Sequence, residues 1–306
     1  MKLDTLHPKA RIRARRALRG RVNPNDVVTP LPFSGALDDR RGDEMLHRGL
    51  FQLNRRRLKP GIVSESTLEF REALRELATI QYFETRILEG ARHAIGPHAS
   101  EAPKDAAGLL TWLDGLRVSG PGQLDPIWSW LATEASEHEL HWFVLQELIA
   151  EVATAELVQV VLGNKATLPA LERLRHMAML LGVTIPHVAS DSDEVSWESM
   201  GRANLVTALA ANRRSQANAV GALAAMMMVQ PARLALIDCA LTRLGYEVYP
   251  PSPPVDRQAV ARLLDQQLVQ DRASAEHIAG GALMWMRASV RCLDGYRSRM
   301  LHDNAA

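Results

Sequence analysis

The sequence predicts an all-α fold, a bundle of about eight to ten helices, on three observations. Apolar residues recur at helical spacing through several long stretches. No segment alternates apolar and polar residues in the way that a half-buried β-strand does. Proline and glycine cluster between the long stretches, where they end one helix before the next begins. With 47% hydrophobic residues, the chain can bury a substantial core.

Four long helices are expected. The first follows Ser66, which forms a capping-box pattern with Glu69, and it ends at Gly96-Pro97. The other long helices are expected at residues 136–162, 202–229 and 274–301, and shorter ones near residues 107, 170, 231 and 257.

Charge divides the chain into two predicted parts, a basic, irregular N-terminal arm at residues 1–62 and a helical domain at residues 63–306. The arm holds 15 Lys or Arg against 6 Asp or Glu, whereas the remainder holds 21 against 29. Such a basic arm can bind phosphate groups, but it has almost no aromatic residues to stack on bases and no DNA-binding spacing. Nucleic-acid binding is therefore disfavoured, and we expect the arm to pack on its own acidic body or on a second subunit.

The composition is that of a soluble globular protein with a net charge of +1. We expect no membrane association, because neither a signal sequence nor a long uninterrupted apolar run is evident. Cys239 and Cys292 are too few and too widely separated for a disulfide framework or a zinc site. The expected location is the reducing cytoplasm.

The densest cluster of possible metal ligands lies in the stretch 134–156. Metal sites in helical bundles combine carboxylates and imidazoles from several helices, often with a Glu-x-x-His turn, which this stretch lacks. A solvated amphipathic face is the simpler interpretation for the histidines. For Glu147, which follows a short apolar stretch, a solvated face and a metal ligand both remain open. The acidic and imidazole residues of the stretch are Glu134, Glu137, His138, His141, Glu147, Glu151 and Glu156.

Two amides interrupt the apolar stripe of the helix expected at 202–229. Asn212 and Gln216 fall on the stripe that also includes Met227. They predict either an interhelical hydrogen-bond network or a polar pocket in the centre of the bundle, with Asn212, Gln216 and Met227 as its residues. The methionines at 226–228 are expected to fill the core, and a copper site is disfavoured.

Three segments together resemble one known family. They are ELHWFVLQELIAE (139–151), NLVTALAANRRSQANAVGALAAMMMVQPAR (204–233) and AEHIAGGALMWMRASVRCLDGYRSRM (275–300). They resemble the bacterial iron-containing redox enzymes of the heme-oxygenase-like diiron oxidase and oxygenase superfamily, over about residues 125–300. The resemblance implies a heme-oxygenase-like helical bundle, usually dimeric. Working members hold two irons, activate dioxygen and oxidise small amino-acid-derived or fatty-acid-like substrates.

The resemblance also implies that most metal ligands have been lost. The family's first glutamate corresponds to Glu147, and Glu151 matches a recurrent acidic position. Met227 stands where the family has a glutamate. The family's HxxxDxxH element reads SPPVDRQA, so that Ser252 and Ala259 replace its histidines while Asp256 is kept, and its second core helix is shortened to one with only Glu172 and His176. The remaining candidates for a vestigial or rearranged metal site are Glu147, Glu151, His176 and Asp256.

Losing several ligands should abolish a diiron site, since loss of outer-shell support alone costs about 10- to 100-fold in affinity. The sequence therefore predicts a degenerate family member with no cofactor. We expect it to act as a partner subunit of an active relative, or as a small-ligand scaffold, in a bacterial biosynthetic or redox pathway, as a homodimer or heterodimer. The alternative is an oxidoreductase acting on a small amino-acid-derived substrate, with iron held by the rearranged ligands or without a cofactor near Asn212 and Gln216.

Overall fold

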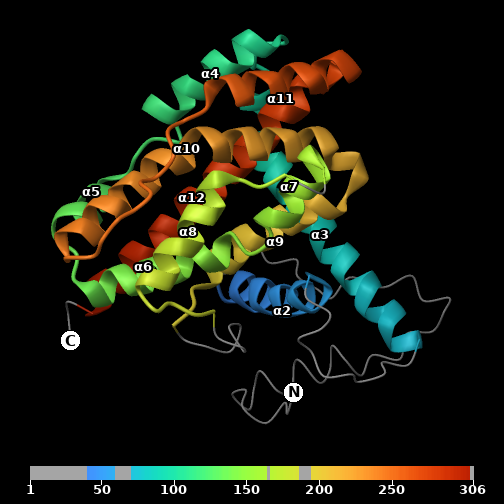
Figure 1. Ribbon diagram of the computed structural model, residues 1–306. Coiled ribbons are helices and arrows are strands. Elements are labelled where there is room, and N and C mark those ends of the chain that lie inside the picture. The colour runs from blue at the N-terminus through green and yellow to red at the C-terminus, as the bar shows by residue number, and fades with distance from the viewer. Residues whose placement is uncertain (1–39, 59–69, 164–165, 186–193, 304–306) are drawn as a thin grey trace. The chain divides into compact units, whose positions relative to one another are not determined.

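The computed structural model describes residues 40–58, 70–163, 166–185 and 194–303, and within these ranges it holds helices and no strand (Figure 1). The prediction of an all-α fold is confirmed. The heme-oxygenase-like arrangement of the bundle stays a prediction. The α-helices of the described residues are α2 (Arg40–Leu58), α3 (Phe70–Ala99), α4 (Ala106–Ser119), α5 (Pro126–Thr133), α6 (Glu137–Ala150), α7 (Thr154–Leu162), α8 (Pro169–Leu180), α9 (Trp197–Ala211), α10 (Gln216–Arg243), α11 (Arg257–Gln270) and α12 (Ala275–Asp303).

The compact main unit begins at Leu46, earlier than the boundary expected at residue 63. Helix α2 lies inside the predicted arm, so residues 40–58 are helical rather than irregular. Within the main unit, Leu50 and Phe51 of α2 are buried, and Asn54 donates a hydrogen bond to Asn204 of α9. The first 39 residues of the predicted arm and the capping pattern at residues 66–69 lie outside the described residues.

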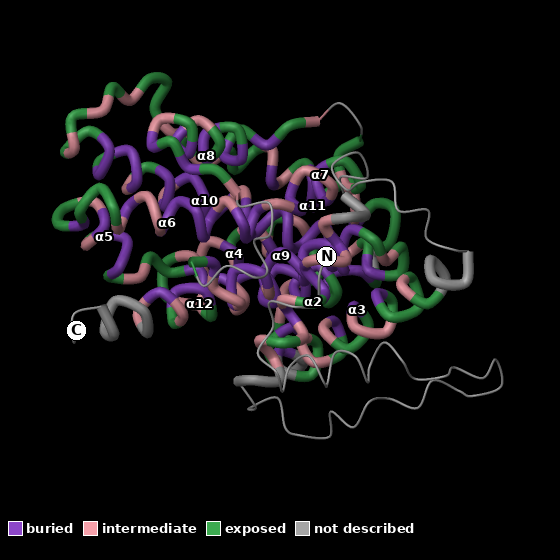
Figure 2. The backbone as a smooth tube through the Cα atoms, turned by 90° about the horizontal axis from the view of Figure 1, so that it is seen from below, coloured by how far each residue is buried: buried purple, intermediate pink, exposed green. Residues whose placement is uncertain are grey.

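Helix α10 is the centre of the core. It packs most extensively on α12 and also contacts α5, α11, α7, α8 and α9. Figure 2 shows buried backbone concentrated along α6, α9, α10 and α12. The stretch Arg213–Arg243, in the described part of the chain, is long and apolar enough to cross a membrane, but 78% of its apolar window is buried inside the protein. Burial of this kind is typical of the core helix of a globular protein.

Two glycines bring the backbones of α10 and α12 into contact. A Cβ atom added at Gly221 of α10 would lie 1.8 Å from the carbonyl oxygen of Ile278 on α12. A Cβ atom added at Gly281 of α12 would lie 1.8 Å from the carbonyl oxygen of Asn218 on α10. Because only hydrogen fits at these two positions, the helices approach each other more closely than side chains would allow.

Several predicted helix boundaries were wrong. The first long helix, expected to end at Gly96-Pro97, continues through both residues as α3 and ends at Ala99. The stretch 136–162 is two helices, α6 and α7, separated by a turn at residues 151–153. The stretch 202–229 breaks at Asn212, whose side chain accepts a hydrogen bond from the backbone N–H of Arg214 and so competes with helix continuation. The short helix expected near residue 231 is instead part of α10, which continues through Pro231. The start of α6 has a capping box, in which Ser136 and Glu139 bond reciprocally.

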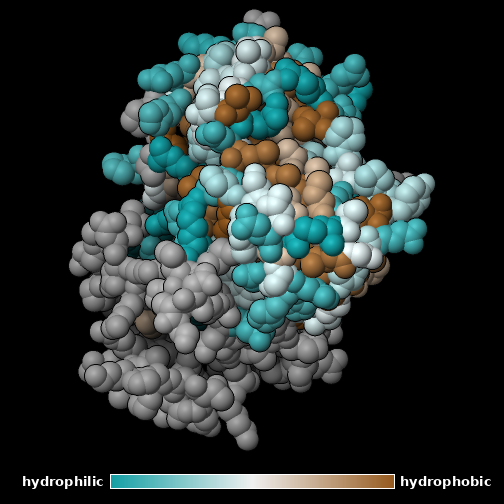
Figure 3. All heavy atoms as spheres, turned by 90° about the vertical axis from the view of Figure 1, so that its left-hand side faces the viewer, coloured by the Kyte–Doolittle hydropathy of each residue, from teal (hydrophilic) through white to brown (hydrophobic). Residues whose placement is uncertain are grey.

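The surface is mixed in character. Figure 3 shows one face on which hydrophobic residues occur in small groups among hydrophilic ones. Exposed apolar side chains include those of Met179, Tyr249 and Val269. Scattered exposure of this kind is common on globular proteins and does not by itself define an interface.

His47 should make the stability of the fold depend on pH. This side chain of α2 is buried and stacks on Trp197 of α9, with ring centroids 5.7 Å apart. Burial, assisted by the positive charge of Arg291, lowers the pKa of His47 from 6.5 to about 4. Between these values the unfolded chain binds more protons than the folded protein, so stability falls as the pH falls.

From pH 7.5 to 4.5 we expect this histidine to remove about 2–3 kcal/mol from the free energy of unfolding, at about 1.36 kcal/mol per pKa unit. The measurement is urea unfolding across that range for the wild type and for His47→Gln, in which the contribution should vanish. His98→Gln, at an exposed position of α3, is the matched control and should keep the wild-type pH dependence. An unchanged dependence in His47→Gln would show that other groups are responsible.

Candidate functional site

Two buried carboxylates share one buried arginine in the core of the bundle. Glu147 lies in the last turn of α6, Glu151 caps the end of that helix, and Arg202 belongs to α9. Nη2 of Arg202 donates to Glu147 Oε2 at 2.8 Å and to Glu151 Oε1 at 3.1 Å, and Nη1 lies 3.4 Å from Glu147 Oε1. Arg202 is 1% exposed, Glu147 2% and Glu151 4%. The guanidinium therefore occupies the position between the carboxylates that a bound cation would need.

Other side chains satisfy the remaining carboxylate oxygens. Nε2 of Gln230, on α10, donates to Glu151 Oε1 at 2.7 Å. The hydroxyl of Thr154 donates to Glu151 Oε2, and the hydroxyl of Tyr296 donates to Glu147 Oε1 at 3.2 Å. Each of the four carboxylate oxygens thus accepts at least one hydrogen bond, as buried carboxylates require.

The two carboxylates are electrostatically unequal. Burial acts to raise the pKa of Glu147, but the charge and hydrogen bonds of Arg202 outweigh it and leave this pKa below its ordinary value. For Glu151, burial outweighs the charge of Arg202 and the hydrogen bond from Thr154, and its pKa is raised. Burial also raises the pKa of the nearby Cys292 thiol to about 12, so this cysteine stays protonated and is not a nucleophile at neutral pH.

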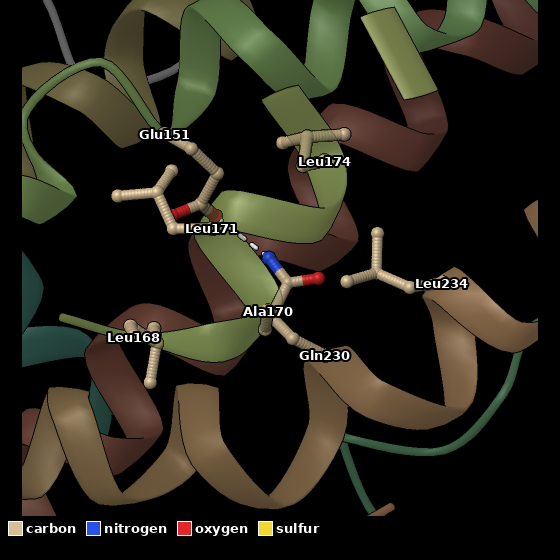
Figure 4. A pocket seen from close by; sticks show the side chains of 7 residues that line it. All are labelled: Glu151, Leu168, Ala170, Leu171, Leu174, Gln230 and Leu234. Atoms are coloured by element: carbon tan, nitrogen blue, oxygen red, sulfur yellow. Dashed lines mark hydrogen bonds between the residues drawn. The ribbon is translucent and has the colours of Figure 1, made fainter. Parts of the chain in front are cut away.

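A small cavity lies beside Glu151. Figure 4 shows the Gln230 amide directed at the Glu151 carboxylate, with apolar side chains around them. The cavity has a volume of about 10 Å³, which is room for one water molecule. Five apolar residues line the rest of the cavity. Leu168 directly precedes α8, Ala170, Leu171 and Leu174 belong to α8, and Leu234 belongs to α10.

A second arginine, Arg233 of α10, is also 1% exposed. Its guanidinium carbon lies 5.3 Å from the ring centroid of Trp128 and 5.6 Å from that of Trp285. Trp285 also has Arg202 near its ring, at 5.9 Å. Burial is the main cause that lowers the pKa of Arg233 to about 10, a value at which it stays charged at neutral pH.

The structure brings only two of the four predicted metal residues together, Glu147 and Glu151. Nδ1 of His176 lies 3.1 Å from Arg173, which is paired with Asp238. Asp256 is exposed at the start of α11, where it accepts a hydrogen bond from the backbone N–H of Ala259. In the described ranges, no three His, Cys, Asp or Glu residues are grouped so as to hold a metal ion.

The prediction of a polar pocket at Asn212, Gln216 and Met227 was wrong. Asn212 caps the turn between α9 and α10, and Gln216 is exposed in the first turn of α10. Met227 is half-buried against the core, between the fully buried Met226 and Met228. For Asn212 the error follows from the helix break, because residues on either side of it do not share one stripe. Gln216 is on α10 with Met227 but lies in the exposed first turn of that helix, outside the core.

Sequence reasoning missed Arg202, Gln230, Arg233 and Tyr296. The signal was clear for Arg233, the one charged residue of α10 between Gln216 and Ile237, and weaker for Arg202, which has Glu198 four residues before it on α9. An arginine at such a position needs a buried partner, and Glu147 and Glu151 were the available carboxylates. Of the other residues in the stretch 134–156, Glu134, Glu137 and His138 are exposed, as expected for an amphipathic face.

Comparison of the chain with protein-family models, with curated proteins and with solved structures found no match in any of the three. Function is therefore argued from the residues of the site.

Proposed function

We propose that this protein acts by binding a protein partner, on a scaffold of the heme-oxygenase-like class whose core carboxylates no longer serve a metal. The observation that carries the proposal is the guanidinium of Arg202 between Glu147 and Glu151, with N–O distances of 2.8 and 3.1 Å. Between these two carboxylates, the guanidinium of Arg202 supplies the positive charge that metal ions would otherwise supply. The loss of histidines at Ser252 and Ala259, inferred from the resemblance, agrees with this proposal.

The residues present do not fit a diiron centre. Iron in such centres needs several carboxylate and imidazole ligands, and it prefers ligands without competing partners. Glu147 and Glu151 already accept hydrogen bonds from Arg202, Gln230, Thr154 and Tyr296. An iron ion at these oxygens would also lie next to the positive charge of Arg202, and electrostatic repulsion would oppose its binding.

A protein partner is favoured over a small ligand because the cavity next to the cluster is too small for one. Its volume of about 10 Å³ is far below the several hundred Å³ of ordinary ligand sites. The fully buried side chains of Trp128, Phe143 and Trp285 contribute to the packed core on the other sides of the cluster. Partner binding makes no demand on the interior, which then serves to hold the scaffold rigid.

Iron loading tests the proposal directly. The protein is incubated anaerobically with ferrous iron and desalted, and its metal content is measured by mass spectrometry for the wild type and for Glu147→Ala. We expect a stoichiometry near zero in both. About one or two ions per chain in the wild type alone would contradict the proposal, and substrate-dependent oxygen consumption that is lost in Glu147→Ala would then establish an oxidoreductase.

The second part of the test concerns the partner. The chain is tagged at its native expression level, and the proteins that co-purify are quantified. We expect one partner in stoichiometric amount, which retrieves this chain when the partner itself is tagged. Purification of the chain alone, at native expression and under low-salt conditions, would count against a partner subunit.

A further inference from the structure

The connection between α10 and α11 is rich in proline. Residues 249–255 read YPPSPPV, in which the prolines are Pro250, Pro251, Pro253 and Pro254. Figure 1 shows this connection as a non-helical segment that joins the two helices. A proline ring fixes its own φ at about −65°, and the residue before a proline is restricted to extended values of ψ. Together these restrictions favour a polyproline II helix, which has about three residues per turn.

Burial along the segment follows the same period of three. Ser252 and Val255 form its inner edge, since the backbone N–H of Ser252 donates to Asp238 Oδ2 of α10 at 2.7 Å and Val255 packs against the core. Pro251 and Pro254, which are also three residues apart, are both exposed. This is the pattern expected of a polyproline II helix that lies on the protein surface with one edge turned to solvent.

The segment is held in place at both ends. Before it, the hydroxyl of Tyr246 donates a hydrogen bond to Glu137 of α6. After it, the side chain of Asp256 caps α11 by accepting from the backbone N–H of Ala259. A partner that bound this segment would therefore not have to order it first, which removes one of the entropic costs of association. Tyr249, directly before the prolines, is 76% exposed and offers an aromatic side chain of the kind that anchors protein interfaces.

Two other ways of recognising a peptide segment are excluded. Addition of a strand needs backbone N–H groups, but four of the residues at 250–254 are prolines, and the N–H of Ser252 is already bonded to Asp238. Insertion of a helix into a groove needs a helix, and residues 249–255 are not helical. Recognition of polyproline II needs neither, because proline side chains three residues apart dock in a groove lined by aromatic rings.

We propose that residues 249–254 are the docking segment for a protein partner with an aromatic-lined groove, of the type found in SH3 and WW domains. Pro251 and Pro254 enter the groove, and Tyr249 extends the contact at one end. The inference rests on the proposed function and deepens it, because it names the surface that the partner binds and the kind of domain that binds it.

The test uses the full chain and the partner that co-purifies with it. Calorimetry compares the affinity of the wild type with that of a variant carrying Pro251→Ala and Pro254→Ala together. We expect at least about tenfold weaker binding, with unchanged helical circular dichroism because both side chains are exposed. Pro169→Ala, at the exposed first position of α8, is the matched control and should keep the wild-type affinity. Unchanged affinity in the double variant would overturn the docking segment and leave the proposed function standing, whereas the absence of any partner would refute both.

Footprinting of the wild-type complex tests the same surface without a variant. Hydroxyl-radical oxidation, measured by mass spectrometry, should fall at Tyr249 when the partner is bound. It should stay unchanged at Met179 of α8, which is 74% exposed. Undiminished oxidation of Tyr249 in the complex would contradict the proposal.

The groove is tested from the partner's side. When unlabelled chain is added to the isotope-labelled partner, the largest chemical-shift changes should fall on a group of tryptophan and tyrosine residues. The changes should be lost with the double proline variant. Shift changes confined to residues other than aromatic ones would contradict an aromatic-lined groove.

Discussion

Arg202→Met is expected to lower the free energy of unfolding by about 3–5 kcal/mol, which is enough to unfold a protein of ordinary stability. The substitution leaves Glu147 and Glu151 together in the core without the cation that they share. Two like charges at close range would then be desolvated with only the more distant charge of Arg233 to compensate them, or one of them would have to take up a proton. Methionine fills much of the vacated volume, so the loss measures charge compensation more than cavity formation.

Urea unfolding at pH 7 measures this effect, with two variants as controls. Arg175→Met removes an exposed ion pair with Glu172 and should cost less than about 1 kcal/mol. Adding Glu147→Gln and Glu151→Gln to Arg202→Met should restore part of the lost stability, since replacing all members of a buried ionic group is tolerated better than removing one. If Arg202→Met alone cost no more than Arg175→Met, the cluster would not stabilise the core.

The class of fold could be predicted because helical periodicity and packing act on the same residues. Many apolar positions at helical spacing, such as Ile80 and Leu88 of α3 and most of those along α10 and α12, are buried in the core. The errors arose where a local effect opposed the structure that the sequence pattern favours. At Asn212 a side-chain hydrogen bond ends a helix whose apolar pattern continues, and at Pro231 the surrounding packing keeps a helix intact across a residue that usually ends one.

The candidate site could be predicted only in part. Glu147 and Glu151 were identified because they lie on the densest acidic stretch and match a recognisable segment. Arg202 is 51 residues from Glu151 in the sequence, and Gln230 is 79 residues from it. A pairing over such separations depends on how α6, α9 and α10 are arranged in space, which periodicity along one helix does not determine. The positions of His176, beside Arg173, and of Asp256, at the start of α11, could not be predicted for the same reason, because a local motif does not reveal which partner a side chain meets.

Gly221→Ala is expected to cost about 3 kcal/mol or more, at the upper end of the range for overpacked cores. The new methyl group would lie 1.8 Å from the carbonyl oxygen of Ile278, and backbone cannot rotate away as a side chain can. Helices α10 and α12, which form the most extensive contact in the bundle, would have to separate. Gly281→Ala should have a similar effect, since its methyl group would meet the carbonyl oxygen of Asn218 at the same distance.

The matched control for both is Gly115→Ala. Gly115 lies inside α4, and a Cβ atom there meets nothing within 4 Å. Alanine at this position should stabilise the protein by about 0.5–1 kcal/mol, because glycine is the weaker helix former. Urea unfolding should therefore show a lower free energy of unfolding for Gly221→Ala and a higher one for Gly115→Ala. Such opposite effects of the same substitution would show that the loss at Gly221 comes from the close approach of α10 and α12. If Gly221→Ala also stabilised the protein, these two helices could not be in backbone contact, and the centre of the fold would have to be packed differently.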